Sequence, residues 1–153
     1  MFLNLLSEES KKAFLELALI CARSSEYAGA AESEMLERYC EEMNIEVPKK
    51  TFRADFIVDA FTSDRAKFDT EIEEIIESIR EDYGDILRAK RIICFELFAM
   101  INADGVKDEL EDAILSKLDA YEASKLDMLA AIVNSHFKVF DDIENLYNKT
   151  RKA

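Results

Sequence analysis

Glycine, proline and histidine are scarce in this chain. Its 153 residues include 3 Gly, 1 Pro and 1 His. A β-sheet protein of this length needs many more turn residues, so the shortage favours long helices with short connections. The single histidine, His136, also argues against a zinc or di-iron centre, because the Glu-x-x-His pattern of ferritin-like bundles is absent.

Cysteines and long apolar runs are few as well. Cys21, Cys40 and Cys94 fall at apolar helical positions without any C-x-x-C pair, so we expect buried free thiols and a reducing, cytoplasmic setting. The opening run 2–6 is too short for a signal peptide or a membrane span. We therefore expect this segment to pack on the core and no helix to cross a membrane.

Positive charge is in deficit. Lys and Arg number 20 against 33 Asp and Glu, which gives a net charge of -13. Such a surface repels phosphate backbones and anionic lipid, so nucleic acid and membrane surfaces are poor partners. It suits divalent cations or another protein with a basic surface, although acidity that only keeps the protein soluble is an open alternative.

Hydrophobic periodicity predicts about seven helices, and the length predicts one domain over residues 1–153. The fold prediction is therefore all-α, a single compact bundle. The segment 85–102 should be its central helix, because Glu96 is the only polar residue between Ile92 and Ile101. The expected helices cover approximately 7–23, 32–43, 52–61, 65–81, 85–102, 107–118 and 124–149, the last with Ile132, Ile143 and Leu146 in its buried stripe.

Two stretches, 14–25 and 94–105, are similar in sequence. Each is an apolar helix that carries one glutamate, Glu16 or Glu96, and continues into a turn and an acidic amphipathic helix. We interpret them as an internal pseudo-two-fold repeat with halves at approximately 7–45 and 85–120. The repeat directs attention to the two turns as the place for a site.

The repeat, the opening Phe2-Leu3-Asn4-Leu5-Leu6-Ser7 and the turn Ala103-Asp104-Gly105 resemble the TerB-like (tellurite-resistance type) helical domain family over residues 1–120. The resemblance implies a non-enzymatic cytoplasmic domain, related to stress or tellurite resistance, that binds partner proteins. It also implies divalent metal at the acidic turns. Two departures favour the alternative of a pure interaction or scaffold module with a vestigial site: Val106 replaces an expected acid, and the turn at 24–27 lacks Asp and Gly.

The candidate ligands for a divalent cation such as calcium are carboxylates: Asp104, Asp108, Glu96 and Glu16. Each has a structural alternative. Asp104 could be a turn aspartate and a helix N-cap. Asp108 with Glu111 fits a helix capping box, and the two glutamates could pair with Lys90, Arg91 or Arg53. EF-hand spacing is absent.

No catalytic set can be assembled from the sequence. Ser135 precedes His136 directly, which is the wrong geometry on a helix for a nucleophile and its base. We therefore expect a binding protein and not an enzyme, with no cofactor beyond the cation.

Overall fold

The structure is a computed structural model. It describes residues 2–24, 29–48, 53–81, 86–103 and 108–120, and between 121 and 153 it describes residues 128, 131–132, 135, 138–139 and 141–146. Every regular element in these residues is helical, which confirms the all-α prediction. The elements are the 3-10 helix η1 (Leu3–Leu5) and the helices α1 (Glu8–Ser24), α2 (Gly29–Met43), α3 (Arg53–Ser63), α4 (Arg65–Glu77), α5 (Ile86–Ala103) and α6 (Glu109–Leu118).

The chain divides into two compact units, residues 1–120 and 121–153. All the helices named above belong to the first unit. In the second unit, Ile132, Ile143 and Leu146 are exposed by 58%, 60% and 67%. The prediction that these three side chains are buried is therefore wrong, while the prediction of one domain over 1–153 stays a prediction.

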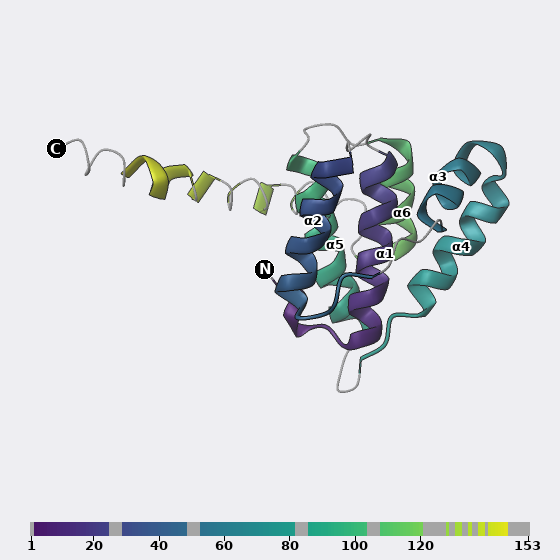
Figure 1. Ribbon diagram of the computed structural model, residues 1–153, viewed down its shortest axis with the longest axis horizontal. Coiled ribbons are helices and arrows are strands. Elements are labelled where there is room, and N and C mark those ends of the chain that lie inside the picture. Colours follow the sequence, from purple (N-terminus) through teal and green to yellow (C-terminus); the bar gives the residue numbers. More distant parts are fainter. Residues whose placement is uncertain are drawn as a thin grey trace. The chain divides into compact units, whose positions relative to one another are not determined.

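Helix α1 is the centre of the first unit. It contacts each of the other five α-helices, whereas α5 contacts α1, α6 and η1. Figure 1 shows α2 and α5 on one side of α1, and α3 and α4 on the other. The helix predicted to be central, 85–102, has no exposed residue from Ile92 to Ile101, but α1 has more helix neighbours. Both helices are rich in apolar residues, but α1 also has the small residues Ala13, Ala18 and Ala22 at buried positions, where neighbouring helices can approach closely.

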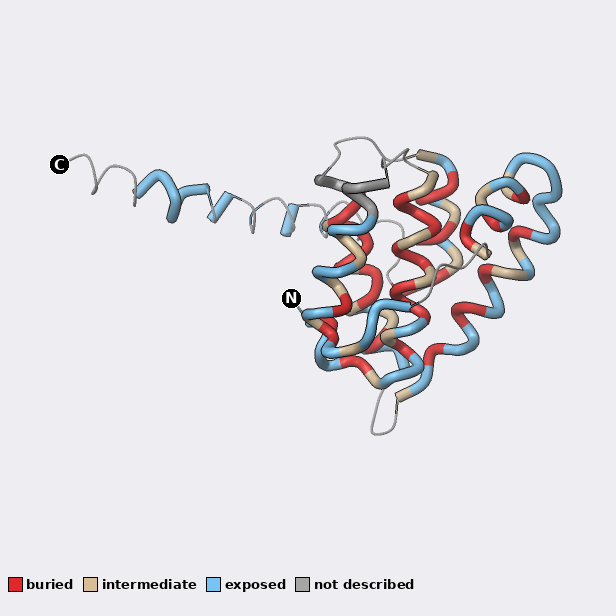
Figure 2. The backbone as a smooth tube through the Cα atoms, in the orientation of Figure 1, coloured by how far each residue is buried: buried red, intermediate tan, exposed pale blue. Residues whose placement is uncertain are grey.

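Figure 2 shows many buried residues along α1, the helix at the centre of the first unit. One face of α1 forms a fully buried stripe at helical spacing, made by Phe14, Leu17, Ala18 and Cys21. In the same figure, exposed residues follow the outer side of α3 and α4. The apolar core of the first unit thus has α1 as its main contributor and the α3–α4 pair as a covering layer.

The opening segment packs on the core as expected. Leu3 is fully buried and Leu6 is 5% exposed. The rings of Phe2 and Phe95 meet edge to face with centroids 5.7 Å apart. These contacts fix η1 against α5, and η1 also contacts α2. Among the described helices, none has the length and apolar character needed to cross a membrane.

Several helix ends follow local capping chemistry. The Ser7 hydroxyl accepts from the Ser10 amide at 3.3 Å, which starts α1. Asp64 accepts from the Lys67 amide at 3.2 Å and starts α4. Asn44 ends α2 with φ of 55°, the left-handed conformation that asparagine tolerates at the end of a helix.

Two boundaries differ from the prediction. Helix α2 begins at Gly29, not at residue 32, because Ala30 and Ala31 are strong helix formers. Helix α4 ends at Glu77, not at residue 81. Here the guanidinium of Arg80 donates to the Glu77 carbonyl, so the end of the helix is satisfied by a side chain.

The segment after α4 is tied to the start of α1. The hydroxyls of Ser7 and Ser10 both donate to the Arg80 carbonyl, and the bond from Ser10 is 2.7 Å long. Ile79 is fully buried although it lies outside the helix. Because Ile79 continues the apolar spacing of α4, the predicted helix was extended too far, to residue 81.

Candidate functional site

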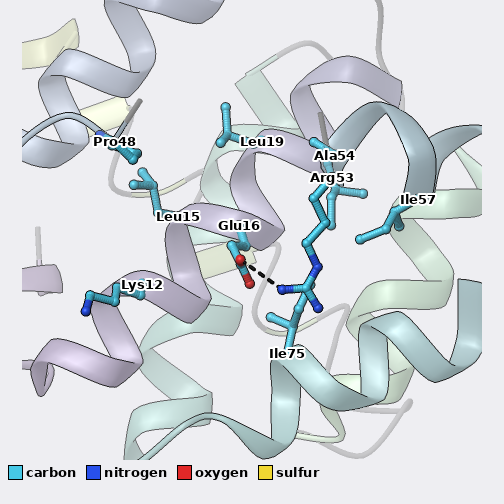
Figure 3. Close-up of a pocket in the computed structure, with 10 residues that line it drawn as sticks. Lys12, Leu15, Glu16, Leu19, Pro48, Arg53, Ala54, Ile57 and Ile75 are labelled. Atoms are coloured by element: carbon cyan, nitrogen blue, oxygen red, sulfur yellow. Dashed lines mark hydrogen bonds and ion pairs between the residues drawn. The ribbon is translucent and has the colours of Figure 1, made fainter. Parts of the chain in front are cut away.

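An apolar pocket of about 250 Å³ lies between α1, α3 and α4 (Figure 3). Its apolar walls come from four separate parts of the chain: Leu15, Leu19 and Ile20 of α1, Pro48 of the segment before α3, Ala54 and Ile57 of α3, and Ile75 of α4. Its charged lining is Lys12, Glu16 and Arg53. The pocket is therefore an apolar space with charges at its edges, the usual composition of a ligand site.

The α1 wall follows from helical spacing. Lys12, Leu15, Glu16 and Leu19 recur every three or four residues, so they share one face of the helix. This stripe lies beside the more deeply buried stripe of Phe14 and Cys21. The α1 helix can therefore contribute both to the core and to the pocket.

Arg53 links three helices at the pocket. It is the first residue of α3, and its Nη1 lies 3.1 Å from Oε1 of Glu16 on α1. Its Nη2 lies 3.2 Å from Glu71 and 3.7 Å from Glu74, both on α4. Three carboxylates thus surround one guanidinium, whose side chain is 40% exposed. We conclude that Arg53 positions the pocket walls.

A second cluster joins the end of α1 to the start of α6. Ser24 Oγ donates to Oδ2 of Asp108 at 2.5 Å. Asp108 Oδ1 accepts from the Glu111 amide at 2.8 Å, while the Asp108 amide donates to Oε1 of Glu111 at 3.1 Å. This reciprocal pair is the predicted capping box, and both carboxylate oxygens of Asp108 are engaged.

Cys21 lies at the same junction. Burial raises the pKa of its thiol well above the usual value, and the nearby carboxylates of Glu111 and Asp108 raise this pKa further. Glu111 is itself only 1% exposed, and its position in the first turn of α6 is favourable for a negative charge. The raised pKa keeps the buried Cys21 thiol protonated near neutral pH.

Glu96 is buried, with 6% of its surface exposed. Its Oε1 accepts a hydrogen bond of 2.9 Å from the Phe2 amide. The matching residue Glu16 is partly exposed and pairs with Arg53, as one of the alternatives anticipated. The two glutamates of the predicted repeat thus have different partners, and the repeat itself stays a prediction.

Among the four predicted metal ligands, the three that the structure describes, Asp108, Glu16 and Glu96, each have a different partner. Asp104 lies outside the described residues, as does the side chain of His136. Asp108 meets Ser24, while Glu16 and Glu96 have the separate partners given above. Across the part of the chain that the structure describes, no three His, Cys, Asp or Glu side chains form a group that could hold a metal ion.

The pocket was not predicted from the sequence. The signal available for its α1 wall was the second stripe at Lys12, Leu15, Glu16 and Leu19. Pro48 and the residues of α3 and α4 carry no comparable signal, because only the packing of α3 and α4 on α1 brings them to the same space.

Comparisons with protein-family models, with curated proteins and with solved structures find no match for this chain. Fold and site together define an all-helical protein with an apolar pocket edged by charge.

Proposed function

We propose that this protein is a non-enzymatic binding domain of the TerB-like type, and that the pocket between α1, α3 and α4 is its binding site for an apolar group. The observation that carries the proposal is the 250 Å³ apolar space bounded by Leu15, Leu19 and Ile57. Binding such a group removes its surface from water, and each buried methylene contributes about 0.8 kcal/mol. A ligand or a partner protein with an exposed apolar group gains affinity in this way.

The TerB-like resemblance sets the proposed context, a domain related to stress or tellurite resistance. In that context a protein partner binds outside the pocket, with its basic groups facing the acidic surface of α4. Asp69 and Glu73 on this surface already accept Lys117 at 3.2 and 3.4 Å. A non-catalytic role agrees with the high pKa of the Cys21 thiol.

Binding to the pocket can be tested with the neutral fluorophore N-phenyl-1-naphthylamine. We expect a saturable rise in fluorescence with wild-type protein. The substitution Ala54→Leu places a larger side chain on the pocket wall and should abolish this component. Ala60→Leu is the matched control, because Ala60 is similarly buried on the same helix but does not line the pocket.

The fluorophore experiment contradicts the proposal if wild-type protein shows no saturable binding, or if Ala54→Leu binds as wild-type protein does. Overpacking at Ala54 could unfold the domain. Circular dichroism identifies that case, and Leu19→Trp then provides a second way to fill the pocket from a partly exposed position.

A second candidate function is divalent-cation binding at the paired turns. It is supported by the 2.5 Å contact between Ser24 and Asp108, because this contact joins the end of α1 to the start of α6. Calcium titration by calorimetry tests it: the proposal expects heat of binding and a higher melting temperature, and it fails if neither occurs. A vestigial site predicts that Asp104→Ala leaves all binding unchanged.

A further inference from the structure

The two cationic side chains that line the pocket, Arg53 and Lys12, differ in how many carboxylates lie close to them. Arg53 has three carboxylate neighbours, Glu16, Glu71 and Glu74, within 3.7 Å. A fourth carboxylate at Arg53 would therefore meet three negative charges. Lys12, by contrast, is exposed, and no ion pair joins it to another residue of the described part of the chain.

Lys12 and Arg53 lie on opposite sides of the pocket, with Glu16 between them (Figure 3). Glu16 is held at 3.1 Å by Arg53, so its carboxylate is directed to that side. Lys12 lines the pocket together with Leu15 and Pro48, and in Figure 3 its ammonium points away from Glu16 and Arg53.

We propose that the pocket binds a small amphipathic carboxylate, with its alkyl chain between the apolar walls and its carboxylate at Lys12. This inference rests on the proposed binding function and adds the chemical class of the ligand. The size of the pocket supports a small molecule, because 250 Å³ is slightly below the range of about 300–1,000 Å³ for drug-sized ligands. The protein's net charge of -13 repels anions in general, so the local ammonium is what makes a carboxylate acceptable here.

Three ligands of equal chain length isolate the contribution of the head group. Octanoate, 1-octanol and octylamine are each titrated against wild-type protein carrying N-phenyl-1-naphthylamine, and displacement is measured. We expect octanoate to bind most tightly. Lys12→Gln should weaken octanoate about fivefold, the scale of one exposed charge pair, and should leave octanol unchanged.

Charge reversal gives the sharpest outcome. Lys12→Glu should reverse the order, so that octylamine binds more tightly than octanoate. Lys11→Gln is the matched control, because Lys11 precedes Lys12, pairs with Glu8 at 3.5 Å and does not line the pocket. This control should bind octanoate as wild-type protein does.

The results separate the two proposals. If the fluorophore binds and is displaced equally by all three ligands, or if Lys12→Glu leaves their order unchanged, the carboxylate inference is overturned and the binding function stands. A preference for octylamine in wild-type protein also overturns it, and identifies Glu16 as the dominant charge. If the fluorophore itself does not bind, the proposed function fails and the inference fails with it.

Discussion

At the residue scale, three carboxylates of this protein each accept from a specific donor. Asp108 caps α6 and accepts from Ser24, Glu96 accepts from the backbone of η1, and Glu16 holds Arg53. Each of these three carboxylates satisfies a specific donor. Their structural roles therefore need no bound ion, and Asp108 also joins the end of α1 to the start of α6.

Replacement of Asp108 by alanine should destabilise the protein. The change leaves the Glu111 amide and the Ser24 hydroxyl without their acceptor. Loss of a helix N-cap costs about 0.5–2 kcal/mol, and we expect the upper half of that range. Urea unfolding of Asp108→Ala measures this loss of stability. Asp108→Asn should lose less, since Asn is an equally good cap.

Glu109→Ala is the control for this capping effect. Glu109 is an exposed acid in the same first turn, and its removal should change stability by less than about 0.5 kcal/mol. Equal losses for Asp108→Ala and Glu109→Ala would show that general charge at the start of α6, and not the cap, determines stability.

The buried cysteines predict how stability changes at alkaline pH. Burial raises the pKa of Cys94 from 9.0 to about 11. The protonated Cys94 thiol makes its full contribution to the free energy of unfolding below pH 9. This contribution decreases as the pH rises toward 11, because the thiol ionises at a lower pH in the unfolded chain than in the folded protein. Cys94 alone should contribute a slope approaching 1.4 kcal/mol per pH unit in this window.

Comparison with Cys94→Ala isolates this slope, because Lys and Tyr titrations are common to both proteins. The variant should be less stable at pH 8, and the difference between the two proteins should decrease toward pH 11. A difference that stays constant from pH 8 to 11 would mean that the Cys94 thiol has an ordinary pKa in the folded protein.

At the element scale, local chemistry made helix starts predictable, while tertiary contacts determined what the sequence did not reveal. The predicted capping box of Asp108 and Glu111 forms at the start of α6 because it depends only on neighbouring residues. The segment after the early end of α4 is held by Ser7 and Ser10, more than 60 residues away, whose hydroxyls donate to the Arg80 carbonyl. A periodic pattern within one segment cannot carry that information.

The short element η1 should contribute strongly to stability through a single residue. Leu3 is fully buried between the helices that η1 contacts, so Leu3→Ala removes apolar contacts and leaves a cavity. We expect a loss of about 2–5 kcal/mol in the free energy of unfolding. Leu5→Ala, at a position that is 53% exposed on the same element, should cost less than about 1 kcal/mol.

Chemical denaturation of both η1 variants tests whether the opening segment belongs to the cooperative core. A small effect of Leu3→Ala would mean that η1 detaches before the rest of the first unit unfolds. The Phe2 amide would then also leave Glu96, since the two contacts lie in the same short segment.

At the scale of the whole molecule, composition predicted the fold class but not the organisation. Scarce glycine and proline correctly indicated an all-helical protein. The central position of α1 was missed, because α1 and α5 are both apolar and composition alone does not show which helix has neighbours on every side. The pocket was missed for a related reason: its lining comes from α1, α3, α4 and Pro48, which are separated in the sequence.

The net charge of -13 predicts that salt stabilises this protein. Self-repulsion opposes the compact state, and raising NaCl from 10 to 150 mM shortens the screening length from about 30 to about 8 Å. Screening also weakens exposed ion pairs such as Lys117–Asp69, but such pairs contribute only about 0–1 kcal/mol each. We therefore expect the melting temperature to rise by a few degrees. KCl should give the same rise, because screening does not distinguish the two cations, whereas a lower melting temperature in both salts would show that the ion pairs outweigh the repulsion.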